Sequence, residues 1–384
     1  MKLDFVTQDF PPERGGIQTY SAELAARLAG KGMEICVQAP YHERAGGYDI
    51  SFPCQVRRYR VPSSHLGLRL LFQYPTSVCE RDVDAVFHAQ WPTLRASIRA
   101  KTKGSNVKIF CAVHGRELFM NPYSFSKSGK LSARFLKHRL KTFQQVDHFF
   151  AVSQFTAQTL KAAGVSPEKV TVVHNGTDPD QYYPDKAIGL SLQKKLGFEN
   201  RKIIYSIARL VPTKGIDTVI ESLTHIISNH PDVLYIIGGK GPYEAQLKER
   251  VIQLGLTDYV YFAGFVADED ANAYYNMADL FVMISRREGP NVEGFGIVFL
   301  EANACAKAVI GSRSGGIPDA VEDGQTGFLV EPNEPGSLAK QINVLFDNEQ
   351  LRLKMGEQGR KRVLESFNWN SVADQVYTKM SELI

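Results

Sequence analysis

Cysteine is scarce in this sequence and is nowhere paired. The 384 residues include five cysteines, and no two of them form a C-x-x-C motif. An odd number of widely spaced cysteines argues against a disulfide framework and against a zinc cluster. We interpret them as reduced core thiols of a cytoplasmic protein. They are Cys36, Cys54, Cys79, Cys111 and Cys305.

Long apolar runs are also missing. No stretch reaches the roughly 18 consecutive apolar residues that a transmembrane helix needs. Residues 1–5 indicate a strand and lack the charged, apolar and small-residue zones of a secretion signal. Glycine (31) and proline (18) are too few for a collagen-like or low-complexity chain. With 43% hydrophobic and 22% charged residues, the chain is typical of a globular protein of two or three domains.

Acidic residues are sparse in one part of the chain. Residues 51–150 contain 17 Lys and Arg against 5 Asp and Glu, although the net charge of the whole protein is only +4. This imbalance indicates contact with something anionic, either a phosphorylated acceptor or a membrane surface. A solvated basic face is the alternative. Nucleic acid is a poorer candidate, because no recognised binding module accompanies the charge.

Short apolar strands alternate with amphipathic helices along the whole chain. This alternation is typical of parallel sheets with helical crossovers, so we predict an α/β protein with two Rossmann-like halves. A polar stretch rich in Asn, Gly, Asp and Pro at 174–200 indicates the interdomain linker, and the end from about 350 to 384 is expected to be helical. The expected strands are 3–7, 34–39, 85–88, 108–113, 149–152, 170–173, 202–207, 233–239, 260–262, 280–283 and 308–310.

Glycines and cations follow two of the expected strands. Gly15 and Gly16 open a helix, where glycine lets backbone approach a ligand and unpaired amides can bind a phosphate. Taken alone, this pair is a weak signal and indicates a turn rather than a ligand site. Arg209 and Lys214 lie between the strand at 202–207 and a helix. Two fixed cations there can clamp a diphosphate, with ordinary surface cations as the alternative.

The most informative motif is an acid pair around a Gly-Phe-Gly turn. Glu293 and Glu301 are eight residues apart and flank residues 294–296. We expect the turn and the following helix start to form an amide-lined anion site, with Glu293 in the loop and Glu301 one to two turns into the helix. Two carboxylates so placed can bind two hydroxyl sets, one on a transferred sugar and one on a ribose. The alternative is acids that only favour the helix dipole.

Together these motifs resemble family 4 retaining glycosyltransferases. The resemblance covers the whole chain in the expected order. The run from Val292 to Ala302 is most similar to bacterial mannosyltransferases of the phosphatidylinositol mannoside type. Further matching segments are residues 175–176, 238–242, 312–319 and 367–369.

The resemblance implies the GT-B architecture, in which two Rossmann-like domains have parallel sheets facing a central cleft. Residues 1–185 would form the N-terminal, acceptor-binding domain. Residues 186–365 would form the C-terminal domain and bind the nucleotide-sugar. A C-terminal crossover helix, about residues 366–384, would return to the N-terminal domain, which suits the apolar stripe that begins at Trp369.

The resemblance also implies roles for single residues. Arg209 and Lys214 would bind the diphosphate and stabilise the charge that develops as it leaves. Glu293 would bind a sugar hydroxyl near the reacting carbon, and Glu301 would hold the ribose hydroxyls. His114 would lie beside the donor sugar without acting as a general base; a loop histidine capping backbone is the alternative. The other donor-binding positions would be Gly15, Gly16, Gly238, Val266, Phe295, Gly296, Ile297 and Val298, with the backbone of Val266 meeting the base.

We expect no metal and no cofactor, since the nucleotide-diphosphate sugar is the substrate. The pairs Asp82-x-Asp84 and Asp178-x-Asp180 have a metal-binding form, but neither lies in a donor loop of this fold and no His or Cys supports them. Glu288 precedes Glu293 by five residues, and we interpret it as a loop acid. In the family's same-face, retaining substitution, the leaving phosphate would take the acceptor proton.

The sequence therefore predicts a metal-independent hexosyltransferase. It would use a GDP- or UDP-linked sugar and a glycan or lipid-linked acceptor, in polysaccharide, lipopolysaccharide or glycolipid assembly. The alternatives are a nucleotide-sugar 2-epimerase on the same fold and a non-catalytic sugar-nucleotide-binding protein. Cations mixed with apolar groups over 57–72 and 127–143 predict docking on an anionic membrane surface, and so a cytoplasmic protein peripheral to the inner face of the membrane.

Overall fold

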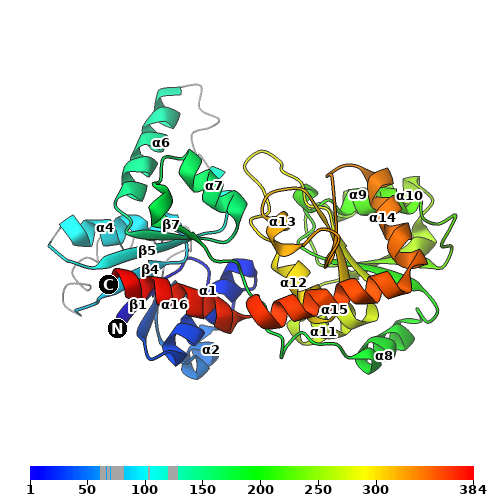
Figure 1. Ribbon diagram of the computed structural model, residues 1–384, viewed down its shortest axis with the longest axis horizontal. Helices are drawn as coiled ribbons and strands as arrows, with labels where there is room; N and C mark the ends of the chain where they lie inside the picture. The colour runs from blue at the N-terminus through cyan, green and yellow to red at the C-terminus, as the bar shows by residue number, and fades with distance from the viewer. Residues whose placement is uncertain (61–65, 67–69, 71–81, 103, 120–128) are drawn as a thin grey trace. The chain divides into compact units, whose positions relative to one another are not determined.

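The computed structural model describes residues 1–60, 66, 70, 82–102, 104–119 and 129–384, which form two compact units (Figure 1). One unit comprises Met1–Asn175 together with Trp369–Ile384, and the other comprises Gly176–Asn368. The chain thus enters the second unit at residue 176 and leaves it at residue 368. The sequence placed these boundaries at 185/186 and 365/366.

The first unit is built on a parallel sheet of seven described strands in the order β3-β2-β1-β4-β5-β6-β7. The strands are β1 (Lys2–Val6), β2 (Glu34–Pro40), β3 (Gln55–Tyr59), β4 (Ala85–His88), β5 (Lys108–Val113), β6 (His148–Ala151) and β7 (Val170–Val172). The α-helices are α1 (Gly16–Gly30), α2 (Ala45–Ser51), α4 (Leu94–Thr102), α5 (Arg116–Phe119), α6 (Gly129–Gln144), α7 (Gln154–Ala162) and α16 (Trp369–Leu383).

The second unit repeats this plan with six described parallel strands in the order β10-β9-β8-β11-β12-β13. The strands are β8 (Lys202–Ile207), β9 (Val233–Gly238), β10 (Val260–Gly264), β11 (Leu280–Met283), β12 (Ala308–Ser312) and β13 (Gly327–Val330). The α-helices are α8 (Lys186–Leu196), α9 (Ile216–Leu223), α10 (Glu244–Gln253), α11 (Asp268–Met277), α12 (Ile297–Ala304), α13 (Ile317–Ala320), α14 (Pro335–Asp347) and α15 (Glu349–Ser366).

Apolar strands explain why both sheets lie inside their units. All six residues of β9 are buried, as are all four of β4, β6 and β11. Such strands are covered by helices on both faces, which is the usual arrangement of parallel sheets. The last helix, α16, packs its apolar stripe within the first unit, where the Trp369 and Tyr20 rings meet edge to face at 6.1 Å. The stripe consists of Trp369, Val372, Val376 and Met380, all buried.

The predicted linker at 174–200 contains the boundary between the units at Asn175/Gly176, but its later part was wrong, because α8 forms over Lys186–Leu196. The side chain of Asp185 caps the start of this helix by accepting a 3.0 Å hydrogen bond from the Ile188 amide. Gly197 ends it in the left-handed conformation, with φ of 74°. The helix interior is polar enough to suggest a loop by composition alone.

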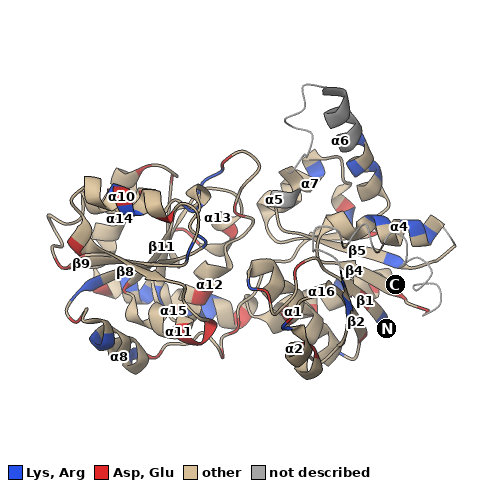
Figure 2. Ribbon diagram, turned by 180° about the vertical axis from the view of Figure 1, so that it is seen from behind, with Lys and Arg blue, Asp and Glu red and all other residues tan. Residues whose placement is uncertain are grey.

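Figure 2 shows Lys and Arg positions in blue on α4 and on the described part of α6. Lys137 and Lys141 of α6 are exposed. Arg139 is directed inward and donates to the Leu118 carbonyl at 2.5 Å. Arg58 likewise pairs with Asp49 at 2.7 Å inside the first unit. Of the other cations in the two segments proposed for membrane docking, Arg69 and Lys127 and the side chains of Lys130 and Arg134 lie outside the described residues.

No helix in the described ranges combines the length and the apolar character required to cross a bilayer.

Candidate active site

The second sheet reverses its strand order between β8 and β11, and the loops after these two strands carry the predicted acid and cation. In a parallel sheet, the crevice at such a reversal, outside the carboxyl ends of the strands, is where ligands bind. Lys214 lies in the loop after β8 and Glu293 in the loop after β11. The topology therefore brings together two residues that are 79 positions apart in the sequence.

Lys214 and Glu293 form an ion pair. The ammonium Nζ of Lys214 lies 2.5 Å from Oε2 of Glu293, and the two side chains are 25% and 19% exposed. The loops are also joined through their backbones, because the Arg286 amide donates to the Thr213 carbonyl at 2.9 Å. The pair is thus a fixed feature at the carboxyl edge of the sheet, with solvent access for a ligand.

Two glycines allow the backbones to come this close. Gly215 has φ of 64°, and a Cβ atom there would lie 1.8 Å from the Ile284 carbonyl oxygen. Gly315 has φ of 57°, and its Cβ would lie 2.1 Å from the carbonyl oxygen of Glu293. Since any other side chain would displace a backbone, glycine is required at both positions.

The Gly-Phe-Gly turn starts helix α12. Gly296, with φ of 95°, is the residue before the helix, and Ile297 and Val298 are its first two residues, whose amides have no acceptor within the helix. The Phe295 ring is buried and stacks on Phe367 with 6.2 Å between centroids. Helix α12 has no acid in its first turn, so the interpretation of Glu301 as a dipole-favouring acid is wrong.

Glu301 lies one turn into α12 and is held by a tyrosine. Its Oε2 accepts a 2.5 Å hydrogen bond from the Tyr275 hydroxyl, which comes from α11. Enclosure by protein raises the pKa of the Glu301 carboxyl to about 7, the Tyr275 hydrogen bond partly opposes this, and Asp268 adds to it. Tyr205 lies against Tyr275 edge to face, with 5.5 Å between their ring centroids. Tyr275 carried no motif signal in the sequence, because only the fold brings α11 beside α12.

The remaining predicted donor residues of the second unit lie on neighbouring strand ends. Arg209 is exposed directly after β8. Gly238 ends β9, and its carbonyl accepts from the Ala208 amide at 3.1 Å. Val266 follows β10 and is 8% exposed. These three residues therefore belong to the same edge of the sheet as Lys214 and Glu293.

The other predicted residues belong to the first unit. Gly15 and Gly16 lie at the start of α1, where Gly15 is the cap residue and no side chain caps the helix. His114 follows β5; its Nε2 lies 3.0 Å from the Ala89 carbonyl oxygen and its ring meets Tyr20 edge to face at 4.7 Å. The Ala89 contact is the backbone contact that the capping interpretation of His114 expects. Roles for these three residues in donor binding stay predictions.

Metal-binding geometry is not found in the part of the chain that the structure describes, where no three His, Cys, Asp or Glu side chains gather as ligands. Of the two D-x-D pairs, Asp84 accepts from the Lys2 amide at 2.7 Å and Asp178 accepts from the Asp180 amide at 2.9 Å. Metal independence remains a prediction, because a substrate can bring its own cation.

Comparison with known proteins matches both units. The family model described as Glycosyltransferase Family 4 matches residues 14–181, and that described as Glycosyl transferases group 1 matches residues 191–362. A GDP-mannose-dependent alpha-(1-6)-phosphatidylinositol monomannoside mannosyltransferase of Mycobacterium tuberculosis is 31% identical over 377 residues, which is 96% of this chain and 95% of the relative. A GDP-mannose-dependent monoacylated alpha-(1-6)-phosphatidylinositol monomannoside mannosyltransferase of Corynebacterium glutamicum is 31% identical over 386 residues, covering 97% and 95%.

A solved structure gives the same fold. Anabaena HepE in complex with UDP superposes with a TM-score of 0.82 at 24% identity, covering all of both chains.

Proposed function

The chain belongs to glycosyltransferase family 4 and is a nucleotide-sugar-dependent glycosyltransferase of the GT-B fold, and we propose that it transfers mannose from GDP-mannose to a lipid-linked acceptor. The choice of donor is supported by relatives that are 31% identical over nearly the whole chain and are named for GDP-mannose. The choice of acceptor is supported by the same names, which specify phosphatidylinositol mannosides. The UDP-bound neighbour is 24% identical and supports the fold alone.

The observation that carries the proposal is the meeting of Lys214 and Glu293 at the strand-order reversal. Lys214, with Arg209 from the same loop, would bind the diphosphate of the donor. Departure of the nucleoside diphosphate develops negative charge on phosphate oxygens, and preorganised cations stabilise that charge in the transition state. Glu293, now paired with Lys214, would accept a hydrogen bond from a sugar hydroxyl.

The nucleoside would lie along the same edge of the sheet. Glu301 would accept hydrogen bonds from the two ribose hydroxyls through the carboxylate that Tyr275 orients. Gly238 and Val266 would line the base, since Gly238 ends β9 and Val266 follows the neighbouring strand β10. The amides of Phe295, Gly296, Ile297 and Val298 would donate to sugar hydroxyls or phosphate, as expected for the start of a helix.

Transfer would retain the anomeric configuration. The bond between the anomeric carbon and the phosphate oxygen breaks, and the acceptor oxygen bonds to the anomeric carbon from the same face. The acceptor proton passes to the departing diphosphate, so no protein base is required. Lys214 and Arg209 would neutralise the leaving group without a metal ion.

Donor choice and transfer can be tested together. Thermal unfolding with GDP, UDP, ADP and their sugars should show the largest rise in Tm with GDP or GDP-mannose, because a ligand that binds the folded state stabilises it. Radiolabelled mannose from GDP-mannose should then enter an organic-extractable lipid, and Lys214→Ala should lower the rate of this transfer by about 100-fold. A larger Tm rise with UDP-glucose, or labelled GDP-sugar epimer formed from donor alone, would contradict the proposal.

We also propose that the basic face of the first unit contacts an anionic membrane. Lys137 and Lys141 are exposed on α6 and suit such a contact. Co-sedimentation with liposomes should increase when anionic lipid is included and should fall in a Lys137→Glu, Lys141→Glu variant. Charge reversal at Lys186 and Lys194 of α8, in the second unit, is the matched control. Equal recovery in the supernatant with and without anionic lipid would remove the proposal.

A further inference from the structure

Arg286, three residues beyond β11, is hydrogen-bonded through its side chain to its own loop, to α9 and to the loop after β13. Its Nη1 and Nη2 donate to Oδ1 and Oδ2 of Asp217, each at 2.8 Å, which is the bidentate geometry that orients a guanidinium most firmly. Its Nε donates to Glu288 at 3.0 Å, and Nη1 also donates to Asn333 at 3.2 Å. The side chain is 14% exposed. Most of its donors are therefore already used within the protein, unlike those of a residue that waits for a ligand.

The partners of Arg286 come from the loops that build the active site. Asp217 lies in the first turn of α9, three residues after Lys214. Glu288 lies in the loop after β11, five residues before Glu293, and Asn333 lies in the loop after β13. One guanidinium thus joins the segment that carries Lys214 to the segment that carries Glu293.

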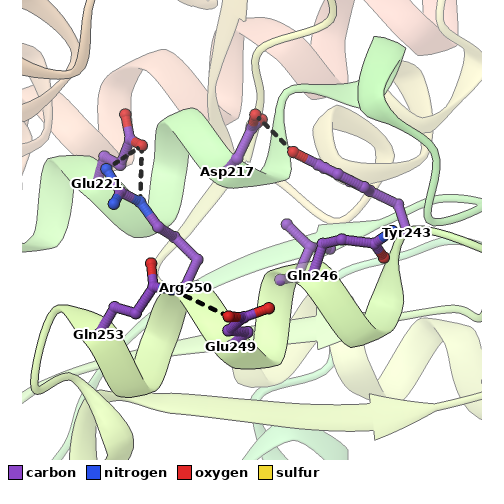
Figure 3. Close-up of a pocket in the computed structure, with 8 residues that line it drawn as sticks. Asp217, Glu221, Tyr243, Gln246, Glu249, Arg250 and Gln253 are labelled. Carbon is purple, nitrogen blue, oxygen red and sulfur yellow. Dashed lines mark hydrogen bonds and ion pairs between the residues drawn. The ribbon is translucent and has the colours of Figure 1, made fainter.

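Asp217 extends the connection to the loop after β9. The Tyr243 hydroxyl donates to Oδ2 of Asp217 at 3.2 Å, at one end of a cavity between α9 and α10 (Figure 3). Tyr243 directly precedes α10 and follows the loop that begins at Gly238. At the other end of the same cavity, Arg250 pairs with Glu221 at 2.7 Å, away from the active-site loops.

Resting on the proposed function, we propose that Arg286 is a positioning residue, which holds Lys214 and Glu293 in the geometry that binds the donor diphosphate and sugar. It does so through Asp217 on the Lys214 side and through its own loop on the Glu293 side. The backbone hydrogen bond from the Arg286 amide to the Thr213 carbonyl joins the same two loops at a second point. Without the guanidinium, Asp217 and Glu288 would be left as two neighbouring carboxylates that repel each other, which would displace Lys214 relative to Glu293.

A double-mutant cycle tests this role. Arg286→Met should lower kcat/KM for donor by about tenfold or more, and Lys214→Ala by about 100-fold. If Arg286 acts by placing Lys214, the double variant should lose less than about threefold beyond Lys214→Ala alone. Arg286→Lys keeps the charge but not the bidentate geometry, and should restore little activity. Arg250→Met, which breaks the ion pair at the other end of the cavity, is the matched control and should keep wild-type kcat/KM.

The outcomes separate this inference from the proposed function. Activity of Lys214→Ala equal to that of the wild type would overturn the site assignment itself. If Lys214→Ala is impaired as expected but Arg286→Met lowers kcat/KM by the same factor in the Lys214→Ala background as in the wild type, only the positioning role is overturned. Wild-type activity in Arg286→Met would also overturn it. Should Arg286→Met fail to fold, Asp217→Asn and Arg286→Lys carry the same cycle, with circular dichroism to confirm folding.

Discussion

Lys214 Nζ and Glu293 Oε2 lie 2.5 Å apart, so the cation proposed for the diphosphate and the acid proposed for the sugar bind each other. A bound donor must therefore break the Lys214–Glu293 ion pair and replace it with contacts to its own diphosphate and sugar. Both side chains retain some solvent access, so a ligand can reach the pair. The loops that carry the two residues are already joined through their backbones, so no rearrangement of the loops is required to bring the residues to the donor.

The first prediction concerns release of Lys214. Glu293→Gln removes the competing carboxylate, and the affinity for free nucleoside diphosphate should rise about two- to fivefold. At the same time kcat should fall about 100-fold, because a contact to the reacting sugar is lost. Isothermal titration calorimetry and initial rates measure the two effects. Lys214→Met is the comparison and should weaken diphosphate binding; weakening of similar size in both variants would show that Glu293 does not restrain Lys214.

The second prediction concerns the proton on Glu301. Since its pKa is raised to about 7, the carboxyl is partly protonated near neutral pH. The ionised form is the stronger acceptor for ribose hydroxyls, so donor affinity should increase as the pH rises through 7. Tyr275→Phe removes the hydrogen bond that favours ionisation and should move the midpoint to higher pH. Donor Kd measured across this pH range gives the midpoint, and a Kd that does not change with pH would contradict the expectation.

The same pKa predicts an effect on stability. A folded-state pKa above the unfolded value of 4.5 means that the folded protein binds this proton more tightly. Stability is therefore lost as the pH rises from about 4.5 to 7, and the loss is complete above pH 7. Glu301→Gln should raise Tm by a few degrees at pH 8 while weakening donor binding. A lower Tm in this variant would show that the carboxylate is well accommodated.

The third prediction compares two glycines with similar φ. Gly315→Ala places a Cβ 2.1 Å from the Glu293 carbonyl oxygen and should displace the acid, with a loss of activity of about 100-fold. Gly289→Ala, at φ of 58° in the loop after β11, meets no atom within 4 Å. Both variants place an alanine in the left-handed conformation, so both Tm values should fall. Only Gly315→Ala should lose more activity than its fall in Tm explains. Equal activity in the two variants would exclude displacement of Glu293.

The fourth prediction concerns His88, which is fully buried at the end of β4. Its ring nitrogens lie 2.7 Å from Thr93 Oγ1 and 2.8 Å from Ser97 Oγ, and burial lowers its pKa to about 3. The unfolded chain therefore binds a proton below about pH 6.5 that the folded chain does not. Stability of the first unit should decline from pH 6.5 towards pH 3, by about 1.4 kcal/mol per pH unit for this one site.

Urea unfolding at several pH values measures that slope. His88→Gln should reduce the slope by about 1.4 kcal/mol per pH unit, because one titrating site is removed. The variant should also be less stable overall, because the ring packing changes. His148, whose pKa burial lowers to about 4, contributes to the slope in the same direction. An unchanged slope in His88→Gln would show that His88 does not titrate on unfolding.

Sequence patterns predicted most of the described strands but missed β3 and β13. Strands such as β9 and β11 are short, continuous apolar runs, a pattern typical of fully buried strands. The edge strand β3 was missed because it has no buried residue and carries Arg57 and Arg58 among its five positions. The short strand β13 begins at a glycine and was also missed. The helix expected after Lys214 is α9, which ends at Leu223, beyond which the chain continues in turns.

The residues of the candidate site also divide into those that the sequence predicted and those that it did not. Lys214, Glu293 and Glu301 were predicted from motifs, because glycines, cations and acids at fixed spacing form a local pattern. Tyr275 and Arg286 were not assigned a role, since their partners are distant in sequence. Arg286 lies 69 residues from Asp217, and Tyr275 lies 26 residues from Glu301.

By itself the sequence determined the two Rossmann-like halves, the family resemblance and the identity of the acid pair. These follow from apolar periodicity and short motifs, which depend only on neighbouring residues. The tertiary structure alone decided which side chains meet, because parallel strands place their carboxyl ends at one edge whatever their order along the chain. The ion pair of Lys214 with Glu293 and the clamp of Arg286 on Asp217 exist for that reason.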